Sequence, residues 1–253
     1  MTQDYKPQFP ADESKFAEIV EALLKSPAAT IITPATGILT LDALAAENGA
    51  NKTQNQWISY WNNIRDGRRF ASAADYYQSF KQLKAAEETG SSQQKAEAHA
   101  LAESLREDLK EFWIVTSTRN IYNPPSLEAE IIQHYGNSNP ALTRKVKLEV
   151  PEWLGVPITE VLKGPKCLSY LQAIFATTDP AETIISTLEY MGGVARNNIK
   201  LWTPPVEEDK QGYLCRKKAK EREAFLGIGG GEFRFDGGDH PGNVIGSSRG
   251  VRG

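Results

Sequence analysis

The chain has 253 residues, with 29 lysine and arginine residues against 32 aspartate and glutamate residues, which gives a formal net charge of −3. This balance excludes a strong overall attraction to nucleic acid or to an anionic membrane, although a local basic patch can still attract either. The length is enough for one large domain or two small ones, with a core that needs no disulfide.

The two cysteines, Cys167 and Cys215, lie far apart in the sequence, and neither has a histidine at metal-ligand spacing. We therefore expect reduced thiols, no metal site and no cofactor. The polar stretch "MTQDYKPQFPADES" lacks the apolar segment of a secretory signal, and no apolar run is long enough to cross a bilayer. These features predict a protein that is not secreted, has no membrane partner, and resides in the cytoplasm or in a particle assembled there.

Helical periodicity dominates the first half of the chain. Apolar residues recur at the i, i+3, i+4, i+7 spacing of amphipathic helices. Thr53 and Gln56 form a capping-box pattern, and Ser72 and Asp75 give a similar start signal. The two longest helices are joined by a few small polar residues, which predicts an antiparallel helical hairpin. The predicted helices cover residues 12–26, 41–47, 53–67, 72–90, 93–115 and 126–136.

The second half of the chain contains the clearest predicted strand. Over residues 144–150, apolar and charged residues alternate at the two-residue period of a half-buried strand, and residues 199–202 are its expected partner. Between these segments, one helix is predicted over residues 165–175. A second is predicted over residues 180–192, with a proline at its first position and glycine at its end.

These elements predict a mainly α fold, built from helical hairpins with a small two- or three-stranded β element and with extended N-terminal and C-terminal arms. In chain order, we expect an N-terminal arm, a helical lobe, an α/β lobe with a helical hairpin, and a charged helix followed by a glycine-rich C-terminal arm. The bounds of these four parts are residues 1–10, 11–136, 140–204 and 205–253.

The last 27 residues contain ten of the 20 glycines. A phosphate-binding loop follows a buried strand and opens a helix, whereas "GIGGGEFRFDGG" follows a predicted charged helix and precedes no helical pattern. Asp239 and His240, followed by Pro241, have the composition of a turn, and we predict no catalytic residue. Phe233 and Phe235 alternate with charged residues, which predicts a strand that docks by β-augmentation on a neighbouring copy or on the protein's own body.

Three stretches gather basic residues that could contact nucleic acid or an acidic partner. The first follows Trp57, Tyr60 and Trp61, whose rings either stack on bases or fill the core. The last is predicted to be a short helix, and the alternative for it is a solvated helix face. The sequence does not show whether the stretches meet. Their residues are Arg65, Arg68 and Arg69, then Arg144, Lys145 and Lys147, and then Arg216, Lys217, Lys218, Lys220 and Arg222.

Three functions remain open at this stage. The first is a non-enzymatic structural or assembly protein that self-associates or joins a larger complex, with the C-terminal arm docking on a neighbouring subunit. Viral and phage structural proteins and nucleoproteins often have this layout, which is an analogy of architecture alone. The alternative is a nucleic-acid-binding adaptor that uses the basic stretches. The third is an enzyme whose site no motif reveals, and we favour the non-enzymatic interpretations.

Overall fold

The computed structural model describes most of the chain between residues 40 and 252. The predicted N-terminal arm, the predicted helix over residues 12–26 and the predicted strand residues 148–150 lie outside the described ranges. The described ranges are 40–44, 52–64, 68–111, 113–123, 127–135, 143–147, 156–162, 165–202, 207–208, 210–211, 214–215, 220–237 and 248–252.

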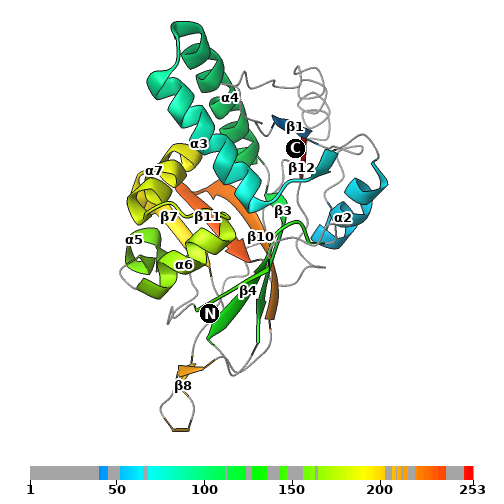
Figure 1. The fold of residues 1–253 in the computed structure, drawn as a ribbon, viewed down its shortest axis with the longest axis vertical. Helices are drawn as coiled ribbons and strands as arrows, with labels where there is room; N and C mark the ends of the chain where they lie inside the picture. The colour runs from blue at the N-terminus through cyan, green and yellow to red at the C-terminus, as the bar shows by residue number, and fades with distance from the viewer. Residues whose placement is uncertain are drawn as a thin grey trace.

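Six α-helices and one 3₁₀ helix lie within these ranges. The capping boxes at Thr53 and at Ser72 are confirmed, because in each the side chain accepts from the backbone three residues later and the reciprocal bond is also present. The predicted long hairpin is also observed, and it rises from one end of the molecule (Figure 1). The helices are α2 (Gln54–Asn63), α3 (Ala73–Thr89), α4 (Ser92–Glu111), α5 (Ile158–Val161), α6 (Pro165–Ile174), α7 (Ala181–Gly192) and η1 (Arg196–Asn198).

A curled, mixed seven-stranded sheet occupies the centre, in the order β5-β4-β3-β10-β11-β7-β6. β11 and β7 pair in parallel, and the other neighbours in this sheet pair antiparallel. A smaller sheet has the order β1-β12-β2, and β8 pairs with β9. The strands are β1 (Thr40–Leu44), β2 (Arg68–Phe70), β3 (Ile114–Tyr122), β4 (Glu128–Ile132), β5 (Thr143–Lys147), β6 (Val156–Pro157), β7 (Ile199–Trp202), β8 (Glu207–Glu208), β9 (Leu214–Cys215), β10 (Lys220–Gly229), β11 (Glu232–Gly237) and β12 (Arg249–Arg252).

The prediction of a mainly α fold with a small β element is therefore wrong. The predicted helix over 93–115 ends at Glu111, and β3 follows it as a central strand of the sheet. β4 lies where a helix was predicted over 126–136, and β1 lies where one was predicted over 41–47. In such short segments the apolar residues fit both a helical and a two-residue period, so pairing with distant strands decides the outcome.

The prediction of an extended C-terminal arm is wrong for residues 220–237. These residues form the β10–β11 hairpin, which pairs with β3 on one side and with β7 on the other, and no charged helix forms over 220–222. Gly230 and Gly231 make the two-residue turn, with φ values of 61° and 77°. Glycine suits this left-handed backbone, so these glycines close a tight hairpin within the sheet.

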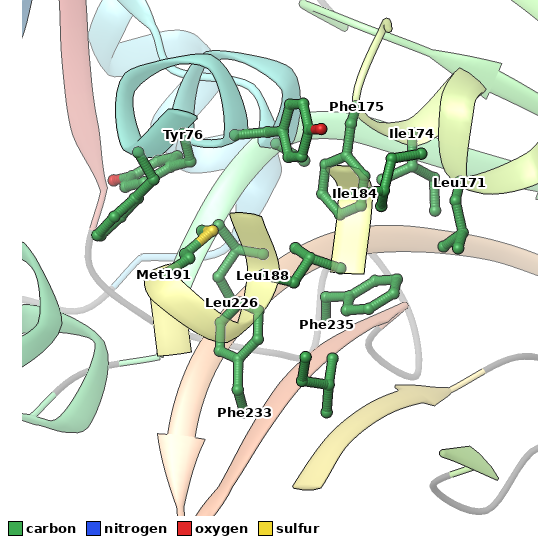
Figure 2. Packing of buried hydrophobic residues seen from close by; sticks show 14 of the residues in the cluster. Tyr76, Leu171, Ile174, Phe175, Ile184, Leu188, Met191, Leu226, Phe233 and Phe235 are labelled. Atoms are coloured by element: carbon green, nitrogen blue, oxygen red, sulfur yellow. The ribbon is translucent and has the colours of Figure 1, made fainter. Parts of the chain in front are cut away.

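The main core lies between this sheet and the helices that cover one of its faces (Figure 2). Phe233 and Phe235, the expected docking residues, point into it and are 0% and 3% exposed. The ring of Phe235 meets that of Phe175 edge-on at a centroid distance of 5.5 Å. A Cβ atom on Gly192 of α7 would lie 2.5 Å from the Cβ of Phe233, so glycine is needed for this close approach.

A second apolar cluster covers the other face of β3. Val115 packs there with Phe70 of β2 and with Trp57 and Trp61 of α2, and all four are buried. The indole nitrogen of Trp61 donates to the hydroxyl of Ser248 at 2.9 Å. The two tryptophans therefore fill a core, which leaves their rings closed to stacking on bases.

Candidate functional site

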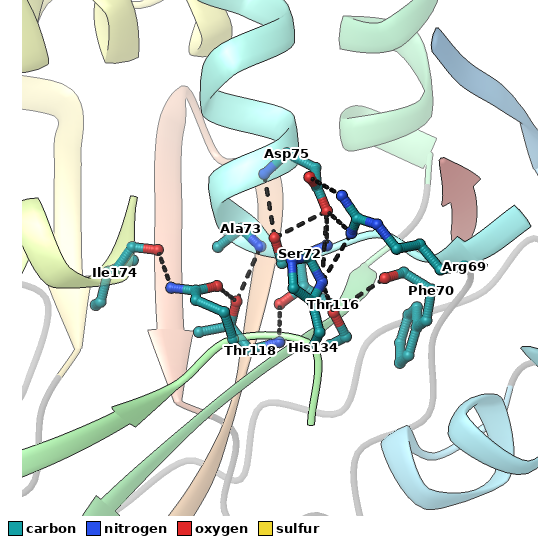
Figure 3. A network of polar contacts seen from close by, with 11 residues as sticks. Arg69, Phe70, Ser72, Ala73, Asp75, Thr116, Thr118, His134 and Ile174 are labelled. Carbon is teal, nitrogen blue, oxygen red and sulfur yellow. Dashed lines mark hydrogen bonds and ion pairs between the residues drawn. The ribbon is translucent and has the colours of Figure 1, made fainter. Parts of the chain in front are cut away.

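A cluster of polar side chains connects β2, the start of α3 and the residues after β4 (Figure 3). Arg69 makes a two-bond ion pair with Asp75, with Nη1–Oδ2 and Nη2–Oδ1 distances of 2.7 and 2.8 Å. Its Nη1 also lies 2.7 Å from Nδ1 of His134. We call these three residues the polar joint, because they fasten the small sheet to both α3 and the main sheet.

Asp75 of the polar joint also stabilises the start of α3, because it completes the capping box with Ser72. Its Oδ2 accepts from the backbone nitrogen of Ser72 at 2.8 Å and from the hydroxyl of Ser72 at 2.9 Å, in addition to Arg69. The carboxylate is buried and holds four hydrogen bonds. Asp75 therefore secures the helix start and Arg69, and it does not hold His134 as a catalytic carboxylate would.

His134 has unusual backbone geometry, with φ at 50° in the left-handed region. A guanidinium group can only donate, so the Nδ1 atom that it contacts accepts, and the neutral ring carries its proton on Nε2. Burial lowers the pKa of His134, the positive charge of Arg69 lowers it further, and Asp75 opposes them. The polar joint is therefore built around a neutral histidine.

Ser117 has its hydroxyl group close to the ring of His134. Its Oγ lies 3.5 Å from Nδ1 and donates to the carbonyl oxygen of Phe70 at 3.0 Å. Because Nδ1 already accepts from Arg69, it has no lone pair with which to remove the serine proton. A base–nucleophile pair is thus not formed here, and the contacts of the polar joint hold elements together.

A buried arginine of β3 connects α2 to the outer face of the main sheet, which is the face opposite the main core. Arg119 is 4% exposed, and its guanidinium donates to Gln54 at 2.8 Å and to Asn55 at 2.7 Å, both in α2. It also lies over the ring of Tyr135 at 3.6 Å. On its open side, Nη1 lies 3.5 Å from a carboxylate oxygen of Glu221, which is half exposed. The sheet face beyond Arg119 is therefore the part that faces solvent.

This part of the sheet carries an ordered set of charges. Register places Ile121 of β3 between Glu130 of β4 and Glu221 of β10, and it places Lys145 of β5 on the other side of Glu130. Directly paired residues share a face of the sheet. Glu128, Lys145 and Glu221 are exposed, and the other two are half-buried. We call this set the charged sheet face: Ile121, Glu128, Glu130, Lys145 and Glu221.

The predicted basic residues of β5 and β10 are divided between the two faces of the sheet. Arg144 pairs with the buried Ile131, so it shares the core face, as does Arg222, which pairs with Asn120 and is 4% exposed. Lys145 pairs with Glu130 and so lies on the other face, and the backbone of Lys147 pairs with that of Glu128. Lys220 pairs with Tyr122, so β10 begins at the end of the sheet where β5 ends.

The first basic stretch lies elsewhere. Arg68 is in β2 and lies over the ring of Trp61 at 5.9 Å, and Arg69 belongs to the polar joint. The structure thus brings the β5 and β10 residues to one end of the main sheet and leaves Arg68 and Arg69 in the small sheet. Contact of these residues with nucleic acid stays a prediction. Four of the residues lie outside the described ranges: Arg65, Arg216, Lys217 and Lys218.

Sequence reasoning missed most of the charged sheet face. It singled out Lys145, but not Glu128 or Glu130, because this segment was interpreted as a helix. The alternation of glutamate with alanine and isoleucine in "EAEII" was a signal for a strand with one charged face. No local signal identifies Glu221 as a neighbour, because its position depends on a β10–β3 register that spans about a hundred residues.

A polar groove of about 550 Å³ lies between α3 and α7. Its cations are already matched, since Lys84 pairs with Glu88 at 2.6 Å and Arg196 pairs with Glu182 and Glu189 at 3.3 Å. No described helix has the length and apolarity required to span a bilayer. In the same part of the chain, no group of three or more histidine, cysteine or acidic residues could hold a metal ion.

No protein-family model matches the chain, and no curated protein or solved structure matches it. The function is therefore inferred from the geometry described above.

Proposed function

We propose that this protein is a non-enzymatic assembly protein that self-associates, and that the charged sheet face is its contact surface. The observation that carries the proposal is the composition of this face. The half-buried side chain of Ile121 lies between Glu130 and the exposed Glu221, and the exposed Lys145 lies beyond Glu130. Protein interfaces commonly combine an apolar centre with a polar rim in this way.

Other classes of partner fit this face less well. A surface for nucleic acid presents mainly positive charge, because it must neutralise phosphates, whereas the central row here carries Glu130 and Glu221 together with Lys145. A small-molecule site is a concave and mostly apolar pocket. A charged face spread over neighbouring strands is a surface of mixed sign and not a pocket, which favours another protein as its partner.

The face also has firm support. Arg119 anchors β3 to α2 beside Glu221, and the opposite side of β3 and β4 packs into the main core through Tyr122, Ala129 and Ile131. Side chains on rigid strands keep their relative positions, so little order has to be gained on association. The charged sheet face is therefore suited to a repeated contact.

Sedimentation velocity of the full chain over a range of concentrations tests the proposal. At about 0.05 M salt we expect the mass to rise above the 28.0 kDa of one chain as the concentration rises. At about 0.5 M salt, screening should return the mass towards one chain, since exposed charges interact weakly at high ionic strength. A single-chain mass at every concentration and both salt levels would contradict the proposed function.

A further inference from the structure

We infer that the charged sheet face binds the same face of a second copy, about a twofold axis that runs parallel to the strands. This inference rests on the proposed function and adds the identity of the partner and the geometry of the contact. It depends on the order in which the four strands carry charge.

The order of charges makes the face complementary to itself in one orientation. From β5 to β10, the central row reads Lys145, Glu130, Ile121 and Glu221, which is positive, negative, apolar and negative. In a twofold contact the same surface meets itself. An axis parallel to the strands reverses the strand order, so β5 faces β10 of the second copy. Lys145 of each copy then faces Glu221 of the other.

The inner strands also match in this orientation. β4 faces β3 of the second copy, so the half-buried side chain of Ile121 lies opposite Glu130 and no two like charges in the central row are opposed. Stacked sheets with aligned strands cross at about 30° and lie about 10 Å apart, which brings side chains of this length into contact. In the central row, each Ile121 thus faces Glu130 of the second copy, and one lysine–glutamate contact lies on each side of this centre.

The other twofold arrangement is disfavoured. An axis in the plane of the face but perpendicular to the strands keeps the strand order, so β5 would face β5 and β10 would face β10. Lys145 would then oppose Lys145, and Glu221 would oppose Glu221. Like charges across an interface suppress the contact, so the charge order selects the first arrangement.

Charge exchange at the two outer strands tests this geometry with the full chain. Lys145→Glu and Glu221→Lys each create two repulsive contacts in a symmetric dimer, so each should weaken association by about tenfold or more. The double variant exchanges both charges within one chain and should associate again. A mixture of the two single variants should form a mixed dimer, because every outer contact in it is attractive.

The outcomes separate this inference from the proposed function. If the natural sequence associates but the single variants associate equally well, or if neither the double variant nor the mixture recovers, the twofold geometry is wrong while self-association stands. If the natural sequence stays a single chain, the proposed function fails, and the inference fails with it. Recovery in both the double variant and the mixture supports the inference.

Two controls separate a specific effect at the charged sheet face from a general effect of charge reversal or unfolding. Lys110→Glu reverses an exposed charge on α4 that pairs with Glu107 at 2.6 Å, so it matches Lys145→Glu in chemistry but lies off the face, and it should leave association unchanged. Glu221 also lies 3.5 Å from Arg119, so thermal unfolding must show that Glu221→Lys stays folded. If it unfolds, the neutral variants Glu221→Gln and Lys145→Gln should each weaken association, and mixing them should recover part of it, because the mixed dimer regains one of the two lysine–glutamate contacts.

Discussion

Replacing Phe233 with alanine tests the position of the β10–β11 hairpin in the core. The ring has no exposed surface and lies 6.5 Å, centroid to centroid, from the ring of Phe235. Removal of a buried phenylalanine ring costs about 3–5 kcal/mol of unfolding free energy. We expect the upper half of this range, because the backbone of Gly192 packs against Phe233 and the α7 helix cannot collapse into the space without moving as a body.

Urea denaturation followed by tryptophan fluorescence measures this loss as a lower midpoint at an unchanged slope. Ile228→Ala is a matched control, because Ile228 pairs with Phe233 across the hairpin but is only half-buried, so it should lose about 1–2 kcal/mol. A loss of less than about 1 kcal/mol at Phe233, or equal losses at both positions, would refute the placement of the hairpin in the core.

Two further predictions concern the supports of the fold. Gly192→Ala should cost about 1–3 kcal/mol through overpacking against Phe233, whereas Gly229→Ala, which has open space around its Cβ position, should change stability by less than about 0.5 kcal/mol in the same urea assay. For His134, burial lowers the pKa in the folded state, so its contribution to stability is complete above the ordinary value of 6.5 and is lost as the pH falls from there through the folded pKa. Asparagine tolerates the left-handed backbone and keeps an acceptor for Arg69, but it does not titrate. The stability of the His134→Asn variant should therefore depend less on pH over about pH 5 to 7 than that of the natural protein. Equal pH dependence in both proteins would contradict the role assigned to the polar joint.

The elements that sequence reasoning predicted well are those with local signals. The capping boxes at Thr53 and Ser72 specify where α2 and α3 begin, because each is completed by a residue three positions later. The α3–α4 hairpin follows from two long amphipathic segments and a short connection. These interactions lie within a few residues, so no knowledge of the rest of the chain is required.

The central strand β3 could not be predicted in the same way. Both of its faces are covered over residues 114–120, and its middle consists of the buried polar residues Thr116, Ser117 and Thr118. Their hydroxyl groups donate to acceptors elsewhere, such as the carbonyl oxygen of Ala224 and the side chain of Gln133. Hydrophobic periodicity fails where partners distant in the sequence satisfy buried polar groups.

In the glycine-rich C-terminal segment, the sequence predicted the strand correctly but did not identify the strands with which it pairs. Alternation at Phe233 and Phe235 did predict a strand with one apolar face, and β11 has this form. The alternation did not indicate the partners of this strand. β11 pairs with β10 across the glycine turn and with β7 in parallel. A strand adds to a sheet by the same backbone bonds whether the sheet belongs to its own chain or to another, so composition alone does not distinguish the two.

The basic stretch in β5 shows why a run of cations in a strand differs from a basic patch. Successive residues point to opposite faces, so Arg144 joins the core face and Lys145 joins the solvent-facing one. Any surface patch must then be completed by neighbouring strands, and β4 supplies Glu128 and Glu130 at the paired positions. The sign of the charge therefore changes between β5 and β4, which weakens attraction to a polyanion and favours a partner with the opposite order. A second copy turned about an axis parallel to the strands presents that order.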